Sequence, residues 1–246
     1  MTNDHSDSDK KPLYNRVILK LSGEMMKGPD AFGIDREAVQ FIAGEIKSVA
    51  DLGVQVGVVV GGGNIFRGNS PAAEGITRAV ADQVGMLATA INALILQDAL
   101  EKFGLNVRTM SAIAMNDVSE AYIRRRAIRH LEKGIVVIFS AGTGNPFFTT
   151  DSAAALRANE LNADAVLKGT KVDGIYTKDP MKYDDAQFLR ECTYSKAISE
   201  NLGVMDTAAL ALARDNKMPI TVYKLDKKGN TRRAVLHGDI GTLVKE

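Results

Sequence analysis

The stretch Val58–Asn64, VVVGGGN, decides the fold class of this chain. A β-branched apolar run of the kind that forms a buried strand ends here in Gly61-Gly62-Gly63. Glycine leaves the backbone N–H groups uncovered, so a turn at this place can surround an anion. Arg67 follows with a planar guanidinium that suits phosphate oxygens. The stretch therefore indicates either a phosphate site or a tight turn that only lets two elements pack.

The composition is that of an ordinary globular protein of 246 residues, with 45% hydrophobic and 25% charged residues. A net charge of +1 gives no electrostatic case for nucleic acid or a membrane surface. Cys192 is the only cysteine, which excludes an intramolecular disulfide and favours a reducing cytoplasm. No apolar run approaches the ~18 residues of a membrane span. We expect a cytoplasmic protein with a disordered tail over residues 1–12 and a single domain over 13–246.

Strand-like and helix-like segments alternate along the chain, which predicts an α/β fold with a mostly parallel central sheet. The predicted strands are Arg16–Leu21, Val54–Val60, Leu105–Met110, Ile135–Ser140, Ala163–Leu167 and Pro219–Tyr223. The predicted helices run from an N-cap at Asp35 to Leu52, over 74–103, after a cap at Ser119, after a cap at Asp151 or Ser152, and over Asp206–Arg214. Asp173-Gly174 is typical of a hairpin turn.

A second glycine-rich loop, AGTGNPFFTT over 141–150, follows the predicted strand Ile135–Ser140. Hydroxyl and amide groups alternate there with Phe147 and Phe148, next to the start of a helix, which favours a nucleotide or sugar phosphate over a purely structural loop. Lys20 ends the first strand, where open α/β sheets bind ligands, although a solvated lysine is the simpler reading.

Three other features allow two interpretations each. Asp82 is either a surface acid or an acceptor for a pair of ligand hydroxyls. Tyr176 is either a base-stacking ring or a half-exposed hairpin aromatic. The arginines of the predicted helix over 124–129 suggest nucleic acid at first, but the neutral chain favours a solvated or subunit-contacting face.

The motifs that are missing narrow the chemistry. The chain has no P-loop motif, no dinucleotide-binding G-x-G-x-x-G after the first strand, no H-E-x-x-H and no G-x-S-x-G. None of its three histidines lies in a glycine loop. Two glycine-rich loops, strand-end lysines and a few aspartates remain, and this set suits phosphoryl transfer, which depends on positioning and charge neutralisation.

Four segments together resemble the bacterial UMP kinases of the amino acid kinase family: Lys20–Gly23, Gly61–Arg67, Ala141–Asp151 and Lys168–Gly174. The resemblance spans about Lys10 to Glu246, and the run TGNPFFTTD separates UMP kinases from the acetylglutamate, aspartate and carbamate kinases of the same fold. It implies a three-layer α/β/α sandwich, usually in a homohexamer, that uses ATP and Mg²⁺ to convert UMP to UDP in pyrimidine nucleotide biosynthesis.

The resemblance also implies roles for individual residues. Lys20 and Lys168 would stabilise the transferred group, and Asp151 would orient them or Mg²⁺, unless it only caps a helix; no residue is assigned to the metal. ATP would contact Lys20, Leu21, Ser22, Gly23, Gly63, Arg67, Thr170, Tyr176 and Asp179. UMP would contact Gly62, Asp82, Thr143, Gly144, Asn145, Pro146, Phe147, Phe148, Thr149 and Thr150. Activation by GTP would involve Gly28, Pro29, Asp30, Ala31, Phe32 and Gly33, and UTP would inhibit.

Two other functions stay open on the sequence alone. A non-catalytic protein of the same fold would bind ATP without turnover that depends on UMP. A sister kinase for an acyl or amino acid substrate should lack Phe147 and Phe148 in the second glycine loop.

Overall fold

The structure is a computed structural model that describes residues 10–67, 74–180, 182–203 and 205–246. Most of the predicted tail, residues 1–9, lies outside the described residues, so the division into a tail over 1–12 and one domain over 13–246 stays a prediction.

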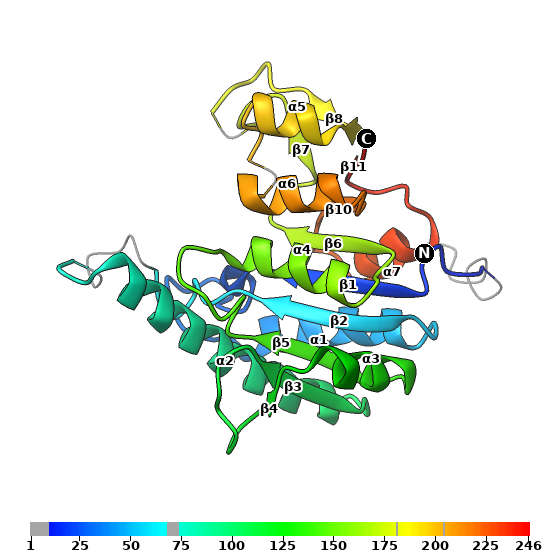
Figure 1. Cartoon of the computed structure of the whole chain (residues 1–246). Coiled ribbons are helices and arrows are strands. Elements are labelled where there is room, and N and C mark those ends of the chain that lie inside the picture. The colour runs from blue at the N-terminus through cyan, green and yellow to red at the C-terminus, as the bar shows by residue number, and fades with distance from the viewer. Residues whose placement is uncertain (1–9, 68–73, 181, 204) are drawn as a thin grey trace.

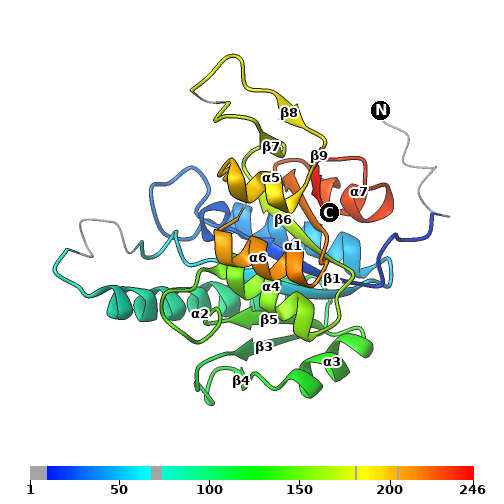
Figure 2. The ribbon, with the colours of Figure 1, turned by 45° about the horizontal axis from the view of Figure 1, so that its top comes forward.

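A nine-stranded sheet forms the middle layer, in the order β4-β3-β5-β2-β1-β6-β10-β11-β9 (Figure 1). All neighbours in this sheet are parallel except β10 and β11. The strands are β1 (Arg16–Leu21), β2 (Gln55–Val60), β3 (Val107–Ser111), β4 (Glu120–Ala121), β5 (Val136–Ser140), β6 (Ala165–Thr170), β9 (Glu191–Cys192), β10 (Ile220–Lys224) and β11 (Thr242–Val244). A separate antiparallel pair, β7 (Ile175–Tyr176) and β8 (Phe188–Leu189), projects beyond the sheet (Figure 2).

Helices cover both faces of the sheet. They are the 3₁₀ turn η1 (Gly23–Met25), α1 (Arg36–Ala50), α2 (Arg78–Lys102), α3 (Arg124–Glu132), α4 (Thr150–Glu160), α5 (Tyr194–Ser199), α6 (Thr207–Asp215) and α7 (Asn230–Leu236). One apolar core joins one sheet face to α1, α2 and α7, and the other core joins the opposite face to α3, α4, α5 and α6. The predicted three-layer α/β fold is confirmed.

Residues of β1 alternate between the two cores, as a strand between two helical layers requires. Val17, Leu19 and Leu21 are buried against the α1 side, whereas Ile18 is buried against the α4 side. Lys20 has the same parity as Ile18, so its side chain belongs to the α4 side. The core packing therefore directs one lysine toward the N-terminus of α4.

Three local predictions are wrong. Ser119 caps no helix: its hydroxyl bonds to the Met115 carbonyl oxygen, and α3 begins after Ile123 without a side-chain cap. The N-cap of α4 is Thr149 rather than Asp151 or Ser152, because the Thr149 hydroxyl accepts from their two backbone N–H groups. Asp173-Gly174 is not the hairpin turn, since it precedes β7 and the connection to β8 follows Tyr176.

The sequence led us to expect no segment that resembles a membrane span, but helix α2 does resemble one. It has 25 residues, and an 18-residue window of it has a mean hydropathy of 1.6, so its length and composition alone would allow a crossing. One side of α2 nevertheless belongs to the core, where Ala93, Leu96 and Leu100 are buried with α1 and the sheet. We therefore interpret α2 as a core helix of the fold.

Candidate active site

Four loops meet at one edge of the sheet because they follow parallel strands. They come after β1, β2, β5 and β6, and include the first glycine turn and the second glycine loop. β1 lies in the middle, with β2 on one side and β6 on the other, so the chain order reverses there. Ligands of open α/β sheets bind beyond the carboxyl ends of the strands at such a reversal.

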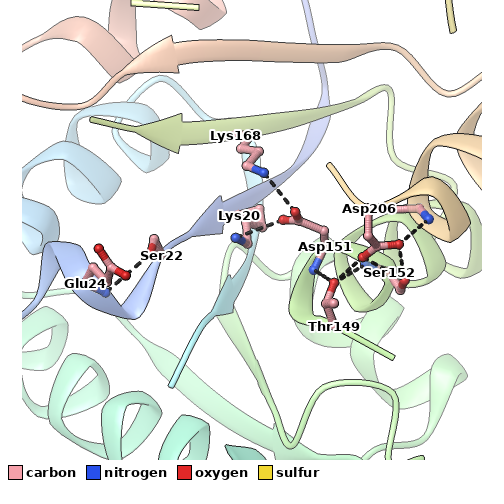
Figure 3. A network of polar contacts seen from close by, with 9 residues as sticks. Lys20, Ser22, Glu24, Thr149, Asp151, Ser152, Lys168 and Asp206 are labelled. Carbon is pink, nitrogen blue, oxygen red and sulfur yellow. Dashed lines mark hydrogen bonds and ion pairs between the residues drawn. The ribbon is translucent and has the colours of Figure 1, made fainter. Parts of the chain in front are cut away.

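Two lysines share one carboxylate at this edge. Lys20 and Lys168 are register partners on β1 and β6. Their Nζ atoms lie 2.8 Å from Asp151 Oδ1 and Oδ2 respectively. Figure 3 shows both lysines pointing from neighbouring strands toward the start of α4. The side chains are only 9%, 13% and 14% exposed for Lys20, Lys168 and Asp151, so the group carries a net positive charge with little screening by water.

The pKa shifts agree with two ammonium groups sharing one acid. Burial alone would raise the pKa of Asp151, but the charges of Lys20 and Lys168 outweigh it and hold that pKa below its ordinary value. Burial lowers the pKa of Lys168, and Asp151 only partly opposes this. An incoming anion would supply the negative charge that the group lacks.

Asp151 is held in place by its neighbours at the start of α4. The Thr149 hydroxyl accepts from the Asp151 backbone N–H at 3.0 Å and donates to Asp206, the N-cap of α6. Asp206 also accepts from the Ser152 hydroxyl at 2.9 Å. This network joins α4 to α6 and frees the Asp151 carboxylate from capping (Figure 3). Asp206 was not among the predicted site residues, because its only signal in the sequence is its place at the start of a helix.

A cleft of about 650 Å³ opens on one side of the lysines. Of the residues predicted to contact ATP, it brings together Lys20, Ser22, Thr170, Tyr176 and Asp179. Leu21 is instead buried in the α1-side core. Gly23 is buried where an added Cβ would lie 2.5 Å from the Gly61 carbonyl oxygen, so this position has a packing role.

A smaller hollow of about 150 Å³ lies between the two glycine loops and α2. Of the residues predicted to contact UMP, Gly62, Asp82, Thr143, Asn145, Phe148, Thr149 and Thr150 line it. Gly63, predicted for ATP, lines this hollow instead of the larger cleft. Gly144, Pro146 and Phe147 are not among its lining residues.

Asp82 fixes the second glycine loop. Its carboxylate accepts from the Phe147 backbone N–H at 2.8 Å and from Arg78 Nε at 2.9 Å. The Phe147 ring is 67% exposed and lies under the Arg78 guanidinium, at 5.9 Å. Asp82 is thus not a plain surface acid. Its carboxylate bonds both to Arg78 of its own helix and to the second glycine loop, and so joins α2 to that loop across the hollow.

Helix α2 supplies site residues that the sequence analysis missed. Ala81, Gly85, Met86 and Thr89 line the smaller hollow. The buried Thr89 hydroxyl accepts from the backbone N–H of Ala141, which has a left-handed φ of 60°. Only Gly85 gave a signal, since a glycine inside a helical pattern commonly marks close packing. Its partner there is Gly62, where an added Cβ would lie 2.9 Å from the Gly85 carbonyl oxygen.

Arg67 is not among the residues that line the larger cleft, but it bonds to two residues beside the site. Its NH2 group is 2.6 Å from Glu24 Oε1, and its Nε donates to the Gly63 carbonyl oxygen at 3.0 Å. Tyr176 belongs to the β7–β8 pair, where its ring packs edge-on against Phe188. Both observations leave the predicted ligand roles of these residues as predictions.

The segment 28–33 is connected to the first glycine turn through Asn64. Gly33 N donates to the Asn64 carbonyl oxygen at 2.8 Å, and Asn64 Nδ2 donates to the Gly33 carbonyl oxygen at 2.9 Å. Asn64 is 1% exposed and also bonds to Asn92 of α2, which donates to the Gly61 carbonyl oxygen at 2.7 Å. The position of this segment and that of the turn are therefore coupled.

Comparisons with known proteins agree with this geometry. Residues 15–224 match the amino acid kinase family. The uridylate kinase of Dichelobacter nodosus is 56% identical over 234 residues, which cover 95% of this chain and 97% of that protein. The uridylate kinase of Methylococcus capsulatus is 54% identical, with 95% and 98% covered. The crystal structure of a UMP kinase from Bacillus anthracis superposes with a TM-score of 0.91 at 43% identity, covering 94% of this chain and 96% of that one.

Proposed function

The chain belongs to the amino acid kinase family, and from that premise we propose that it transfers the γ-phosphoryl group of ATP to UMP, giving ADP and UDP. The observation that carries the proposal is the pair of buried lysines that line the larger of two cavities and share Asp151, which directly follows Thr149 and Thr150 of the smaller cavity. The larger cleft suits a nucleoside triphosphate, and the hollow between the glycine loops suits the smaller acceptor nucleotide.

The lysines would act on the group in transfer. Phosphoryl transfer needs little covalent help from the protein, but negative charge on the transferred group must be neutralised and the two oxygens must be held in line. The ammonium groups of Lys20 and Lys168 are pre-positioned for this by Asp151, so they need not reorganise during the reaction. Backbone N–H groups of the glycine turn would add donors between the two nucleotides.

The acceptor would lie against α2 and the second glycine loop. Asp82 would accept from the ribose hydroxyls, exchanging its bond to the Phe147 backbone N–H for the ligand or holding both. The half-exposed ring of Phe148 would cover the nucleotide. On the donor side, Thr170, Tyr176 and Asp179 would contact the adenosine.

Mg²⁺ would enter the site bound to the phosphates of ATP and not through a set of protein ligands of its own. The residues that the structure describes hold no group of three or more His, Cys, Asp or Glu side chains placed to bind a metal. Mg²⁺ usually keeps several waters and binds through one or two carboxylates plus substrate phosphates. Asp151 would be the carboxylate nearest the transferred group, and the ion would add neutralising charge on the phosphates.

A panel of nucleoside monophosphates tests the proposal. Purified protein with ATP and Mg²⁺ should convert UMP to UDP, with CMP far slower. Equal use of AMP and UMP would overturn the assignment of the acceptor. Tight ATP binding without turnover that depends on UMP would favour the non-catalytic alternative, and phosphorylation of an acyl or amino acid substrate would favour a sister kinase.

We propose further that GTP activates and UTP inhibits the enzyme, with GTP acting through residues 28–33. The support is the buried link from Gly33 through Asn64 to the first glycine turn. The panel repeated with and without each effector tests this. An Asn64→Ala variant should lose response to GTP, while an unchanged response would contradict the route.

We propose a homohexamer in the cytoplasm, without membrane or nucleic acid partners. The support is the outer side of α2, where Val80, Leu87, Ile91 and Leu94 are 46%, 49%, 46% and 37% exposed in one chain. An exposed apolar stripe of this kind along a helix is commonly an interaction surface, and a second copy of this chain would cover it. Leu87→Asp should reduce the mass measured by light scattering, whereas Leu13→Asp, at an equally exposed residue elsewhere, should not. An unchanged mass for the first variant would contradict this interface.

A further inference from the structure

Glu24 forms ion pairs with two cationic side chains, Arg67 and Lys171, that lie on different loops of the site. It lies on η1, the 3₁₀ turn directly after β1. Its Oε1 is 2.6 Å from NH2 of Arg67, which follows the first glycine turn. Its Oε2 is 3.5 Å from Nζ of Lys171, which follows β6. The carboxylate of Glu24 thus links the segment after the first glycine turn to the loop after β6.

Glu24 lies on the wall of the larger cleft, where a ligand could reach it, and not in the core. It lines the larger cleft together with Lys20, Lys168 and Lys171. An added Cβ on Gly63 would lie 4.0 Å from Glu24 Cγ, so the stem of the side chain lies beside the third glycine. Its side chain is 36% exposed, and its partners Arg67 and Lys171 are 47% and 60% exposed. Ion pairs this open to water are weak and exchangeable.

A guanidinium recognises a carboxylate and a phosphate through the same forked donor geometry. A triphosphate in the cleft would carry several negative charges, whereas the Glu24 carboxylate carries one. It would compete for Arg67 and Lys171 and release the carboxylate toward solvent. When the phosphates leave, Glu24 would return and keep the two cations paired.

We propose that Glu24 competes with the donor phosphates: its carboxylate pairs with Arg67 and Lys171 and must be displaced from them before a triphosphate binds. The inference rests on the proposed function, because it takes the larger cleft as the donor site. It adds a positioning residue whose removal should strengthen binding instead of weakening it. A residue that only orders Arg67 for the nucleotide would have the opposite effect.

The test compares binding of inorganic tripolyphosphate and of ATP in EDTA, measured by calorimetry on the full chain. Glu24→Gln should bind both anions about threefold tighter or more at low salt, the size expected when two exposed ion pairs no longer compete. The gain should shrink as salt is raised, because these groups are screened. Glu24→Ala should behave alike, and circular dichroism checks that both variants are folded.

Glu37→Gln is the matched control. Glu37 is exposed and lines with Glu24 a hollow of about 410 Å³ beside the cleft, but it has no ion pair with Arg67 or Lys171. Its removal changes the net charge equally and should leave affinity within about twofold. An equal gain in the control, or unchanged or weaker binding in Glu24→Gln, would overturn the inference. Neither assay uses UMP, so a chain that binds as expected yet makes no UDP would overturn only the proposed function.

Discussion

Asp151→Asn tests how much the shared ion pairs of Asp151 contribute to the stability of the site. It keeps the shape of the side chain and removes the carboxylate that Lys20 and Lys168 share. At 2.8 Å and an effective dielectric of about 20, each ion pair has a gross Coulomb attraction of roughly 6 kcal/mol. The asparagine oxygen keeps one hydrogen bond and Lys168 can release its proton. We therefore expect a net loss of about 3–5 kcal/mol in the free energy of unfolding, as for other broken buried pairs.

The loss should depend on pH in a definite direction. Burial already holds the pKa of Lys168 below its ordinary value, and Asp151 opposes that shift. In the variant the folded chain should therefore bind fewer protons than the unfolded chain between neutral pH and the ordinary lysine pKa. Unfolding free energy then rises with pH in that window, so the deficit relative to wild type should shrink from pH 7 toward pH ~10.

Urea unfolding at a fixed protein concentration measures both effects, at pH 7 and at pH 9.5. Asp98→Asn is the control, since Asp98 forms an exposed i,i+4 pair with Lys102 and should change stability by less than about 0.5 kcal/mol. Asp151→Asn/Lys168→Met should recover part of the loss because the unpaired charge is gone. A loss below about 1 kcal/mol at pH 7, or a deficit that grows with pH, would refute the reasoning.

Four further outcomes follow from the same geometry. Lys20→Ala should lower turnover by ~10² or more if the ammonium stabilises the transferred group, and near-normal steady-state rates would refute that role. Gly62→Ala should cost about 1–3 kcal/mol in thermal or urea unfolding, because the new Cβ would lie 2.8 Å from the Ala88 Cβ; an unchanged midpoint would show that α2 can retreat. Thr89→Val leaves the Ala141 N–H without its acceptor, so it should cost about 1–3 kcal/mol and raise KM for UMP more than it lowers kcat. Wild-type stability should fall as pH drops below about 4 through the lowered pKa of Asp151, and the loss in acid titrations should be smaller in Asp151→Asn, where only other carboxylates such as Asp239 contribute; an equal loss would contradict this.

The strands and the site edge could be predicted because their signals are local. The apolar runs of β1, β2 and β5 are each matched to within about two residues, which is ordinary for element ends. The Asp35 cap is correct, because its carboxylate accepts from the Ala38 backbone N–H at 2.7 Å. Parallel pairing then brings the glycine turn and the second glycine loop to one edge without further information.

The errors share a different cause: competition between partners far apart in sequence. Asp151 had the local pattern of a cap, but two lysines from other strands attract its carboxylate and Thr149 caps the helix instead. Asp173-Gly174 had the pattern of a hairpin turn, but β7 pairs with β8 across a longer loop. No local signal could reveal that Thr89, inside an apolar helix, supports the second glycine loop.

The structure also explains why glycine is needed at particular positions of the first turn. Side chains at Gly61 and Gly62 would meet the backbone of Gly23 and helix α2, at 2.9 Å and 2.8 Å from Gly23 N and the Ala88 Cβ. At Gly63 the nearest atom is 4.0 Å away, on Glu24. Two of the three glycines are therefore required by packing, and the third borders the place where the phosphates would lie.

The most direct measurement of the central claim is phosphorus NMR of the wild-type protein with ATP, UMP and Mg²⁺, beside the Lys20→Ala variant. We expect UDP and ADP to appear in equal amounts with no inorganic phosphate, and the variant to form UDP at least ~10²-fold more slowly. Release of inorganic phosphate without UDP, or equal rates in the two proteins, would contradict transfer between two nucleotides across the lysine pair.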